Sequence, residues 1–313
     1  MTALVTLGEA MAVLAADRPG PLACGTPLRL GFAGAEATVA IGVSRLGHPT
    51  SWTGRVGADS SGTMILDGLR GEAVDISRAR VDDAAPTGLM LRERRTPDHT
   101  RVTYYRRGLA GSRLAPEDID PELVTRARVL HITGITPALG DAPRAAVRRA
   151  VDLARAAGVT VSLDLNYRAR LWTREEAAAE LSDLVTRADI VFAGPDEAAL
   201  VVPEADPASM ARALLLLGPH EAVMKLGARG ALAATDGGEA VQDIVPVTLV
   251  DPIGAGDAFV AGYLAGLLDG AALPGRLQLA ATCGAFAVAA SGDWEGLPRR
   301  AELDLLHGDD VTR

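Results

Sequence analysis

The chain has 313 residues, a formal net charge of -9 and an isoelectric point near 5.1. This length suits one large α/β domain or two smaller ones, and the acidic balance argues against nucleic acid or an anionic membrane as a partner, because both attract basic surfaces. Two cysteines, no basic N-terminal region and no apolar run long enough to span a bilayer lead us to expect a soluble, unprocessed cytoplasmic protein that binds a small molecule.

Apolar residues at helical spacing alternate along the chain with short extended apolar runs. The helical patterns predict helices at 36–46, 59–69, 142–157, 175–187, 208–217 and 278–290. The extended runs predict strands at 4–7, 51–56, 74–76, 129–132, 159–165, 190–192 and 222–224. Several of these runs are continuously apolar, which is typical of parallel strands covered by helices on both faces. The chain is therefore expected to form one doubly wound α/β domain.

One region interrupts this alternation. Leu89 and Leu91 lie in one extended arm and Tyr104 and Tyr105 in another, with a polar turn at 94–100 between them. This arrangement predicts a β-hairpin that projects from the edge of the domain. The Gly- and Pro-rich stretch that precedes the first helix is expected to be β-structure or loop.

The stretch from Asp251 to Phe259 is the strongest candidate for chemistry. It follows an extended run at 245–250 and leads into a helical pattern, so Gly254, Ala255 and Gly256 are expected at a helix N-terminus. Unpaired backbone N–H groups and the helix dipole make such a terminus an anion site that suits a phosphate. Asp257 then either takes a proton from an attacking hydroxyl or only caps the helix, and spacing alone does not decide between these roles.

Two further stretches follow predicted strands, at the sheet edge where ligands bind in parallel α/β folds. Residues 164–168 offer a carboxylate, an amide and a guanidinium, although they could equally form a solvated loop. Residues 225–230 place two glycines where nucleotide phosphates could approach, although the same letters make a common turn before a strand.

Other phosphate-binding patterns are missing from the sequence. The chain's single lysine is not preceded by glycine or followed by Ser or Thr, which excludes a Walker-type phosphate loop. The first strand leads into Gly8-Glu9-Ala10-Met11 and not into a Gly-x-Gly-x-x-Gly sequence, which argues against a conventional dinucleotide-binding enzyme. His131 lies in an apolar strand and is interpreted as a core residue.

Two signatures together resemble those of the PfkB, or ribokinase-like, carbohydrate kinases. Asp251 to Asp257 reproduces the family's Asp-Thr-x-Gly-Ala-Gly-Asp signature with Pro252 in place of Thr, and Gly31 to Gly47 matches its glycine-bearing N-terminal signature. The resemblance covers nearly the whole chain. It implies a single ribokinase-like domain over 1–313, with a mostly parallel sheet flanked by helices and a small β-lid inserted at about 12–33 and 85–108.

Within this family the chain most resembles the kinases of 2-keto-3-deoxygluconate. The resemblance rests on 34–36, 87–89, 104–108 with 110–112, 131–139, 164–168 with 171–172, and 291–296. It implies phosphorylation of the terminal hydroxyl of a keto-sugar acid with ATP and Mg²⁺. Arg106 and Arg168 would meet the carboxylate of such a substrate in a two-pronged manner.

The resemblance also implies a role for each candidate site residue. Asp257 would be the general base, and the N–H groups of Gly254, Ala255 and Gly256 would stabilise the transferring phosphoryl group. The sugar acid would contact Gly34, Tyr104, Arg106, Arg168 and Asp293. The nucleotide would contact Asn166, Lys225, Gly227 and Gly230. Glu197 would help to hold Mg²⁺ through water.

Two further properties are left open by the resemblance. One is a monovalent cation such as K⁺ near Asp251. The other is a homo-oligomer, a dimer or higher, formed through the lid.

The sequence departs from the family pattern at Thr38, where Asn is frequent, at Met90, where Tyr is found, and at Gly194, where Asn begins an Asn-x-x-Glu motif. These changes leave open which sugar acid is bound, including the gluconate and galactonate epimers. The alternatives are a fructokinase- or ribokinase-type enzyme for a neutral sugar, and a catalytically idle sugar-acid sensor.

Overall fold

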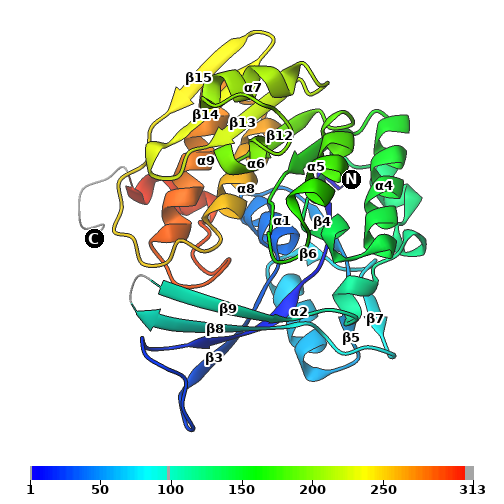
Figure 1. Cartoon of the computed structure of the whole chain (residues 1–313), viewed down its shortest axis with the longest axis vertical. Coiled ribbons are helices and arrows are strands. Elements are labelled where there is room, and N and C mark those ends of the chain that lie inside the picture. Colours follow the sequence, from blue (N-terminus) through cyan, green and yellow to red (C-terminus); the bar gives the residue numbers. More distant parts are fainter. Residues whose placement is uncertain (1, 97–98, 307–313) are drawn as a thin grey trace.

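A large sheet forms the centre of the molecule (Figure 1). The computed structural model describes residues 2–96 and 99–306, and within this part nine strands form that sheet. The strands are β1 (Leu4–Leu7), β4 (Thr50–Thr53), β6 (Val74–Asp75), β10 (Val129–Thr133), β11 (Thr160–Asp164), β12 (Ile190–Ala193), β13 (Glu221–Lys225), β14 (Ala231–Thr235) and β15 (Gly238–Gln242).

The order across this sheet is β15, β14, β13, β12, β11, β10, β1, β4, β6. The strands from β13 to β6 are parallel to their neighbours, whereas β14 and β15 are antiparallel. This arrangement brings the carboxyl ends of β11, β12 and β13 to one edge of the sheet.

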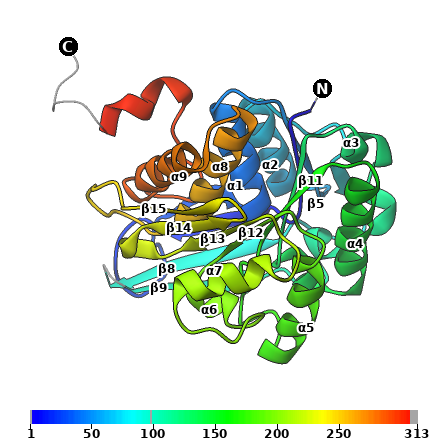
Figure 2. The same cartoon turned by 90° about the horizontal axis from the view of Figure 1, so that it is seen from above.

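Helices cover both faces of the sheet (Figure 2). One face carries α1 (Ala35–Arg45), α8 (Ala255–Leu268) and α9 (Leu273–Val288), and the other carries α3 (Pro121–Thr125), α4 (Asp141–Ala156), α5 (Arg174–Val185), α6 (Pro195–Ala198) and α7 (Pro207–Leu215). Helix α8 packs between α1 and α9, which explains why its side chains are apolar nearly all round. The predicted doubly wound α/β fold is confirmed.

A smaller mixed sheet forms the lid. In the described residues it has four strands in the order β3 (Leu28–Ala33), β2 (Met11–Ala16), β8 (Leu89–Thr96), β9 (His99–Tyr105). Met11, Val13 and Met90 cluster on one face of this sheet. The predicted hairpin is therefore confirmed as β8 and β9, and the preceding Gly- and Pro-rich stretch contributes the other two strands. Part of the expected polar turn, residues 97–98, lies outside the described residues.

The remaining elements lie beside the lid. Helix α2 (Ser60–Gly71) packs against β2 and β5 (Arg55–Gly57), and β5 pairs with β7 (Arg80–Asp82). The single strand predicted at 51–56 is divided at Gly54 into β4 and β5, where a side chain would overlap Trp52. Within the described residues, no helix is long and apolar enough to cross a membrane.

One sequence prediction is wrong. The run at 245–250 is not a strand, and Leu249 and Val250 are 65% and 43% exposed. The amides of Val250 and Asp251 donate to the carbonyl of Val288 at 2.8 and 3.2 Å, so this segment is held by α9. Its alternating apolar residues resemble a strand, but they have no buried face against which to pack.

Candidate active site

Gly254 shapes the start of α8. It is the residue before the helix, with a left-handed φ of 78°, and a side chain there would overlap the carbonyl oxygen of Asp293. Only glycine fits both requirements. No side chain caps this helix, so its first N–H groups remain available to an anion. Asp257 lies in the first turn and is not the capping residue, which removes the capping interpretation.

Asp257 has a pKa raised to about 7. Burial is the main cause and the charge of Asp164 adds to it, whereas Arg168 and Lys225 lower the pKa. The side-chain amide of Asn166 lies 3.4 Å from one of its carboxylate oxygens. A carboxyl group with a pKa near neutrality is suited to exchanging a proton with a substrate hydroxyl.

Lys225, at the end of β13, is the only lysine among 31 basic residues. Its Nζ lies 2.6 and 2.7 Å from the two carboxylate oxygens of Asp164, at the end of β11, and 3.9 Å from Glu197. Burial lowers the pKa of Lys225, but the two carboxylates outweigh burial and raise it. A Cβ at Gly256 would lie 3.9 Å from Nζ, so the ammonium group sits beside the α8 turn.

Asn166 has φ of 38° and is almost fully buried. A positive φ is uncommon for residues other than glycine, and Asn is among the few that adopt it. The next amide, that of Tyr167, donates to Glu197 at 3.2 Å. This bend turns Asn166 toward Asp257 and fixes the loop that also carries Arg168.

Both carboxylate oxygens of Glu197 are held by backbone amides, those of Tyr167 and of Gly194 at 2.6 Å. Burial raises its pKa, while Lys225 lowers it. Among the described residues no three His, Cys, Asp or Glu side chains form a metal cluster. The carboxylate of Glu197 is the kind of oxygen ligand that Mg²⁺ takes, directly or through water.

The turn after β13 is built around Gly227 and Gly230, with φ of 59° and 81°. A side chain at Gly230 would overlap the carbonyl oxygen of Gln242, whereas nothing lies within 4 Å of a side chain at Gly227. The exposed Leu249 and Val250 supply apolar surface in the segment before α8. Because this turn directly follows β13, Gly227 and Gly230 lie on the same sheet edge as Lys225.

The predicted sugar-acid contacts form a second group near the lid. Gly34 starts α1, and a side chain there would lie 2.5 Å from the carbonyl oxygen of Glu9. Arg106 pairs with the buried carboxylate of Glu9 and lies 5.5 Å from the ring centroid of Tyr104. The guanidinium of Arg106 thus already has an acidic partner.

A hollow of about 370 Å³ lies between β9 and the loop after β11. Nine residues line it, including three arginines and no acidic residue: Thr103, Tyr104, Arg106, Arg107, Ser112, Ala138, Leu139, Arg170 and Leu171. Such a lining favours an anionic group.

Arg168 lies in the loop after β11, two residues before Arg170, which lines this hollow. It is exposed, and in the part of the chain that the structure describes its side chain makes no ion pair. Its positive charge nevertheless lowers the pKa values of Asp257 and Glu197. Arg168 is therefore near the reacting groups and free to take a substrate carboxylate.

Asp293 is placed differently from the other expected sugar contacts. Its carboxylate accepts a hydrogen bond from Arg92 of β8 at 2.6 Å. Sequence reasoning offered the carboxylate of Asp164 as a candidate, but it did not single out Arg92 or Glu9. Glu9 lies two residues after a strand of the central sheet, and Arg92 is a charged residue on an inward-facing position of an alternating strand, so each left a weak signal.

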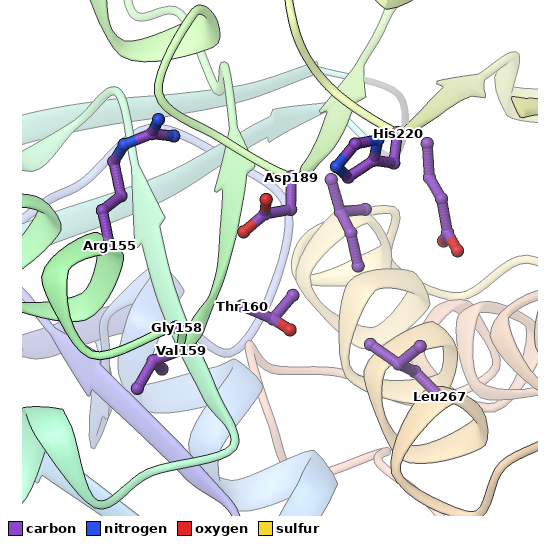
Figure 3. A pocket seen from close by; sticks show the side chains of 9 residues that line it. Arg155, Gly158, Val159, Thr160, Asp189, His220 and Leu267 are labelled. Carbon is purple, nitrogen blue, oxygen red and sulfur yellow. The ribbon is translucent and has the colours of Figure 1, made fainter. Parts of the chain in front are cut away.

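A second cavity, of about 390 Å³, lies at the opposite edge of the sheet (Figure 3). Its lining includes Thr160, Ile190 and Glu221, which are the first residues of β11, β12 and β13. Asp257 and Lys225 are at the carboxyl ends of these strands. The cavity in Figure 3 is therefore remote from the residues described above and is not part of this site.

Comparisons with known proteins identify the family of this chain. The sequence profile described as pfkB family carbohydrate kinase matches residues 1–300. The 2-dehydro-3-deoxygluconokinase of Thermoproteus tenax is 39% identical over 311 residues, covering 98% of this chain and 94% of that protein. The 2-dehydro-3-deoxygluconokinase of Bacillus subtilis (strain 168) is 37% identical over 302 residues, covering 96% and 93%.

The fold is shared with a solved structure from E. coli, a putative ribokinase II in complex with ATP and Mg²⁺. It has a TM-score of 0.91 at 26% identity and covers 98% of this chain and 99% of that one. The agreement in sequence and in structure extends over nearly the whole length of both partners. The chain belongs to the pfkB family of carbohydrate kinases.

Proposed function

We propose that the protein transfers a phosphoryl group from ATP to the terminal hydroxyl of 2-keto-3-deoxygluconate, also called 2-dehydro-3-deoxygluconate. The observation that carries the choice of a sugar acid is the hollow beside β9, which is lined by Arg106, Arg107 and Arg170 and by no acidic residue. Similarity to two 2-dehydro-3-deoxygluconokinases supports the same substrate.

In this proposal Asp257 accepts the proton of the attacking hydroxyl. Its pKa of about 7 leaves a substantial fraction ionised at neutral pH while keeping the carboxylate basic. The N–H groups at Gly254, Ala255 and Gly256 would bind the oxygens of the transferring group, where negative charge must be stabilised. The hydroxyl attacks phosphorus, the bond to the leaving phosphate oxygen breaks, and Asp257 holds the proton.

ATP and Mg²⁺ are typical of this family. We propose that the nucleotide lies along the turn with Gly227 and Gly230, and that Lys225 faces its phosphates. Glu197 would hold Mg²⁺ through water, and the ion would neutralise phosphate charge. Because ATP is the donor, we place the enzyme in the cytoplasm.

Arg168 would be the main partner of the substrate carboxylate, since Glu9 already balances the charge of Arg106. Arg106 and Tyr104 would shape the pocket, with Gly34 giving close access to the backbone. Met90, on the lid face that carries Met11 and Val13, offers no hydrogen bond.

We also propose that the described chain acts as one kinase domain that associates through its lid. The face of the lid opposite to Met90 carries a cross-strand row of Leu30, Leu14 and Leu91, and Leu30 is 57% exposed. The end strands of this sheet, β3 and β9, have no further strand partner among the described residues, and an apolar row on such a sheet favours pairing with a second copy.

The decisive experiment is a coupled assay of ADP formation across sugar acids and neutral ketoses. We expect the highest kcat/KM for 2-keto-3-deoxygluconate, with its galactonate epimer as the nearest competitor. A preference for a neutral ketose would replace the sugar-acid assignment by an enzyme of the fructokinase or ribokinase type. Two features favour that alternative: Met90 is apolar, and the charge of Arg106 is already balanced by Glu9. Tight binding of a sugar acid without any ADP formation would instead identify a sensor.

A further inference from the structure

Arg92 is a buried arginine on the inner face of the lid. It lies in β8, two residues from Met90, and is 5% exposed. In the sheet it is aligned with Ala15 of β2, which is in turn aligned with Arg29 of β3. Arg29 lies in the same row, and therefore on the same face of the sheet, but its side chain is exposed and pairs with the exposed Asp17.

The guanidinium of Arg92 meets two carboxylates of the main body of the molecule. Its Nη2 donates to Asp293 at 2.6 Å, and its Nη1 lies 3.9 Å from Asp251. Its Nε is buried without a hydrogen-bond partner. A buried cation is costly unless it is paired, so these two carboxylates define the position of Arg92.

Both carboxylates belong to segments that hold the α8 turn. The second oxygen of Asp251 accepts from the amide of Ile253 at 3.2 Å, which bends the chain directly before Gly254. The carbonyl of Asp293 packs against Gly254, at a distance that no side chain would tolerate. A change in either segment therefore moves the N–H groups proposed to bind the phosphoryl group.

The local charge balance depends on Arg92. Burial raises the pKa of Asp293, and Glu295 and Asp251 raise it further, whereas Arg92 lowers it. Without the guanidinium, the carboxylates of Asp251, Asp293 and Glu295 would repel one another beside the turn that is proposed to bind phosphate. Arg92 of the lid therefore supplies a positive charge at this place.

We propose that Arg92 is a positioning residue that links the lid to the phosphoryl-binding turn: its guanidinium, held by Asp251 and Asp293, supplies the positive charge for which a bound monovalent cation would otherwise be needed. Phosphoryl transfer by this protein is then independent of K⁺, and the turn is ordered only when the lid is in place. The catalytic part of this inference rests on the proposed kinase function.

Three variants test the proposal. Arg92→Gln removes the charge, Arg92→Lys keeps it, and Arg29→Gln removes an exposed arginine from the same row of the lid. We expect Arg92→Gln to lower kcat by about tenfold to a hundredfold, because small displacements of a binding group carry losses of that size. Arg92→Lys should recover part of the loss, and Arg29→Gln should behave as the unchanged protein.

The dependence on cations separates a positioning role from a merely structural one. Activity is compared in KCl and in tetramethylammonium chloride at equal ionic strength. The unchanged protein should show the same kcat in both salts, whereas K⁺ should raise the kcat of Arg92→Gln severalfold. Stimulation of the unchanged protein by K⁺, or native turnover of a folded Arg92→Gln, overturns the proposal.

A binding measurement needs no turnover and so remains valid if the kinase assignment is wrong. Binding of Tl⁺, a stand-in for K⁺, is followed by ²⁰⁵Tl NMR line broadening. Arg92→Gln should bind Tl⁺ and the unchanged protein should not. Should Arg92→Gln fail to fold, Arg92→Met, which also removes the charge but keeps an unbranched side chain, provides the same comparison, and Tl⁺ binding by the unchanged protein again contradicts the proposal.

Discussion

At the scale of single residues, Asp257 combines two opposing influences. Burial and Asp164 hold its proton, while Arg168 and Lys225 favour its ionised form. The balance leaves its pKa at about 7, well above that of an ordinary aspartate. A base with this pKa is unprotonated in about half of the molecules at neutral pH and in most of them above it.

We accordingly expect kcat/KM to fall about tenfold for each pH unit below about 7, because the protonated carboxyl cannot accept the hydroxyl proton. Above that pH the value should be level. The measurement is a pH profile of kcat/KM at saturating ATP. Asp257→Asn serves as the control: its residual turnover should lose this dependence while sugar binding persists. Near-native turnover of Asp257→Asn would contradict the assignment of Asp257 as the base.

Arg168 and Arg106 differ in a way that affects specificity. Arg106 is paired with Glu9, whereas Arg168 makes no ion pair within the described residues. Arg168→Ala should therefore raise the dissociation constant of a sugar acid by more than tenfold, roughly the 1.5–3 kcal/mol of a charge-assisted hydrogen bond. The matching neutral sugar should be affected much less. Isothermal titration with both sugars measures the difference, and equal losses would refute recognition of the carboxylate by Arg168.

The residues of the site were predictable to different degrees. Gly254 to Asp257 are contiguous, so their spacing along a helix N-terminus could be read directly. Arg92 and Asp293 are 201 positions apart in the sequence, and only the packing of the lid brings them together. The same holds for Glu9, whose pairing with Arg106 depends on how the first strand meets the hairpin.

At the scale of elements, periodicity identified the helices and the parallel strands because each buries one or both faces. It failed where burial is absent, as in the exposed run at 245–250. It also could not show that the N-terminal Gly- and Pro-rich stretch would pair with the hairpin, since strand pairing depends on the partner.

The end of α1 is fixed by a partly buried ion pair. Arg45 donates to Glu72 at 2.8 and 2.9 Å and to the carbonyl of Leu297 at 2.5 Å. This ties α1, which carries Gly34 at its start, to α2 and to the segment after α9. The hydrogen bond from Arg45 lowers the pKa of Glu72.

Arg45→Ala should cost about 2 kcal/mol in the free energy of unfolding, since the partly buried carboxylate of Glu72 loses two charge-assisted hydrogen bonds and keeps only the one from Arg299 at 3.2 Å. The depressed pKa of Glu72 gives the sign of the pH dependence: the stabilisation is present above the ordinary pKa of a glutamate and is lost as the pH falls through the lowered value. Urea unfolding at neutral and acidic pH measures both effects. Arg70→Ala, which breaks the exposed pair with Asp67, is the control and should change stability little.

At the scale of the whole molecule, the two faces of the lid differ in what they contact. The inner face carries Met90 and Arg92 toward the main body. The outer face presents the row of Leu30, Leu14 and Leu91. The family's small sheet was predictable from the hairpin and the resemblance, but the division of its faces required the strand register.

We expect Leu30→Glu to convert the protein from an oligomer to a monomer, because a charge in the centre of an apolar interface is strongly unfavourable. Sedimentation velocity gives the molecular mass directly. Exposed Arg29, on the opposite face, is the matched position for a control, and Arg29→Glu should leave the mass unchanged. A monomeric unchanged protein would contradict association through the lid.

Lys225 has a practical consequence for the study of this enzyme. Because it is the only lysine in the chain, feeding isotope-labelled lysine places the label at one position, between Asp164 and Glu197. Its spectrum then contains a single side-chain ammonium signal, with no assignment problem. A nucleotide phosphate that approaches Lys225 would shift this signal, which makes the protein its own spectroscopic reporter of donor binding in solution.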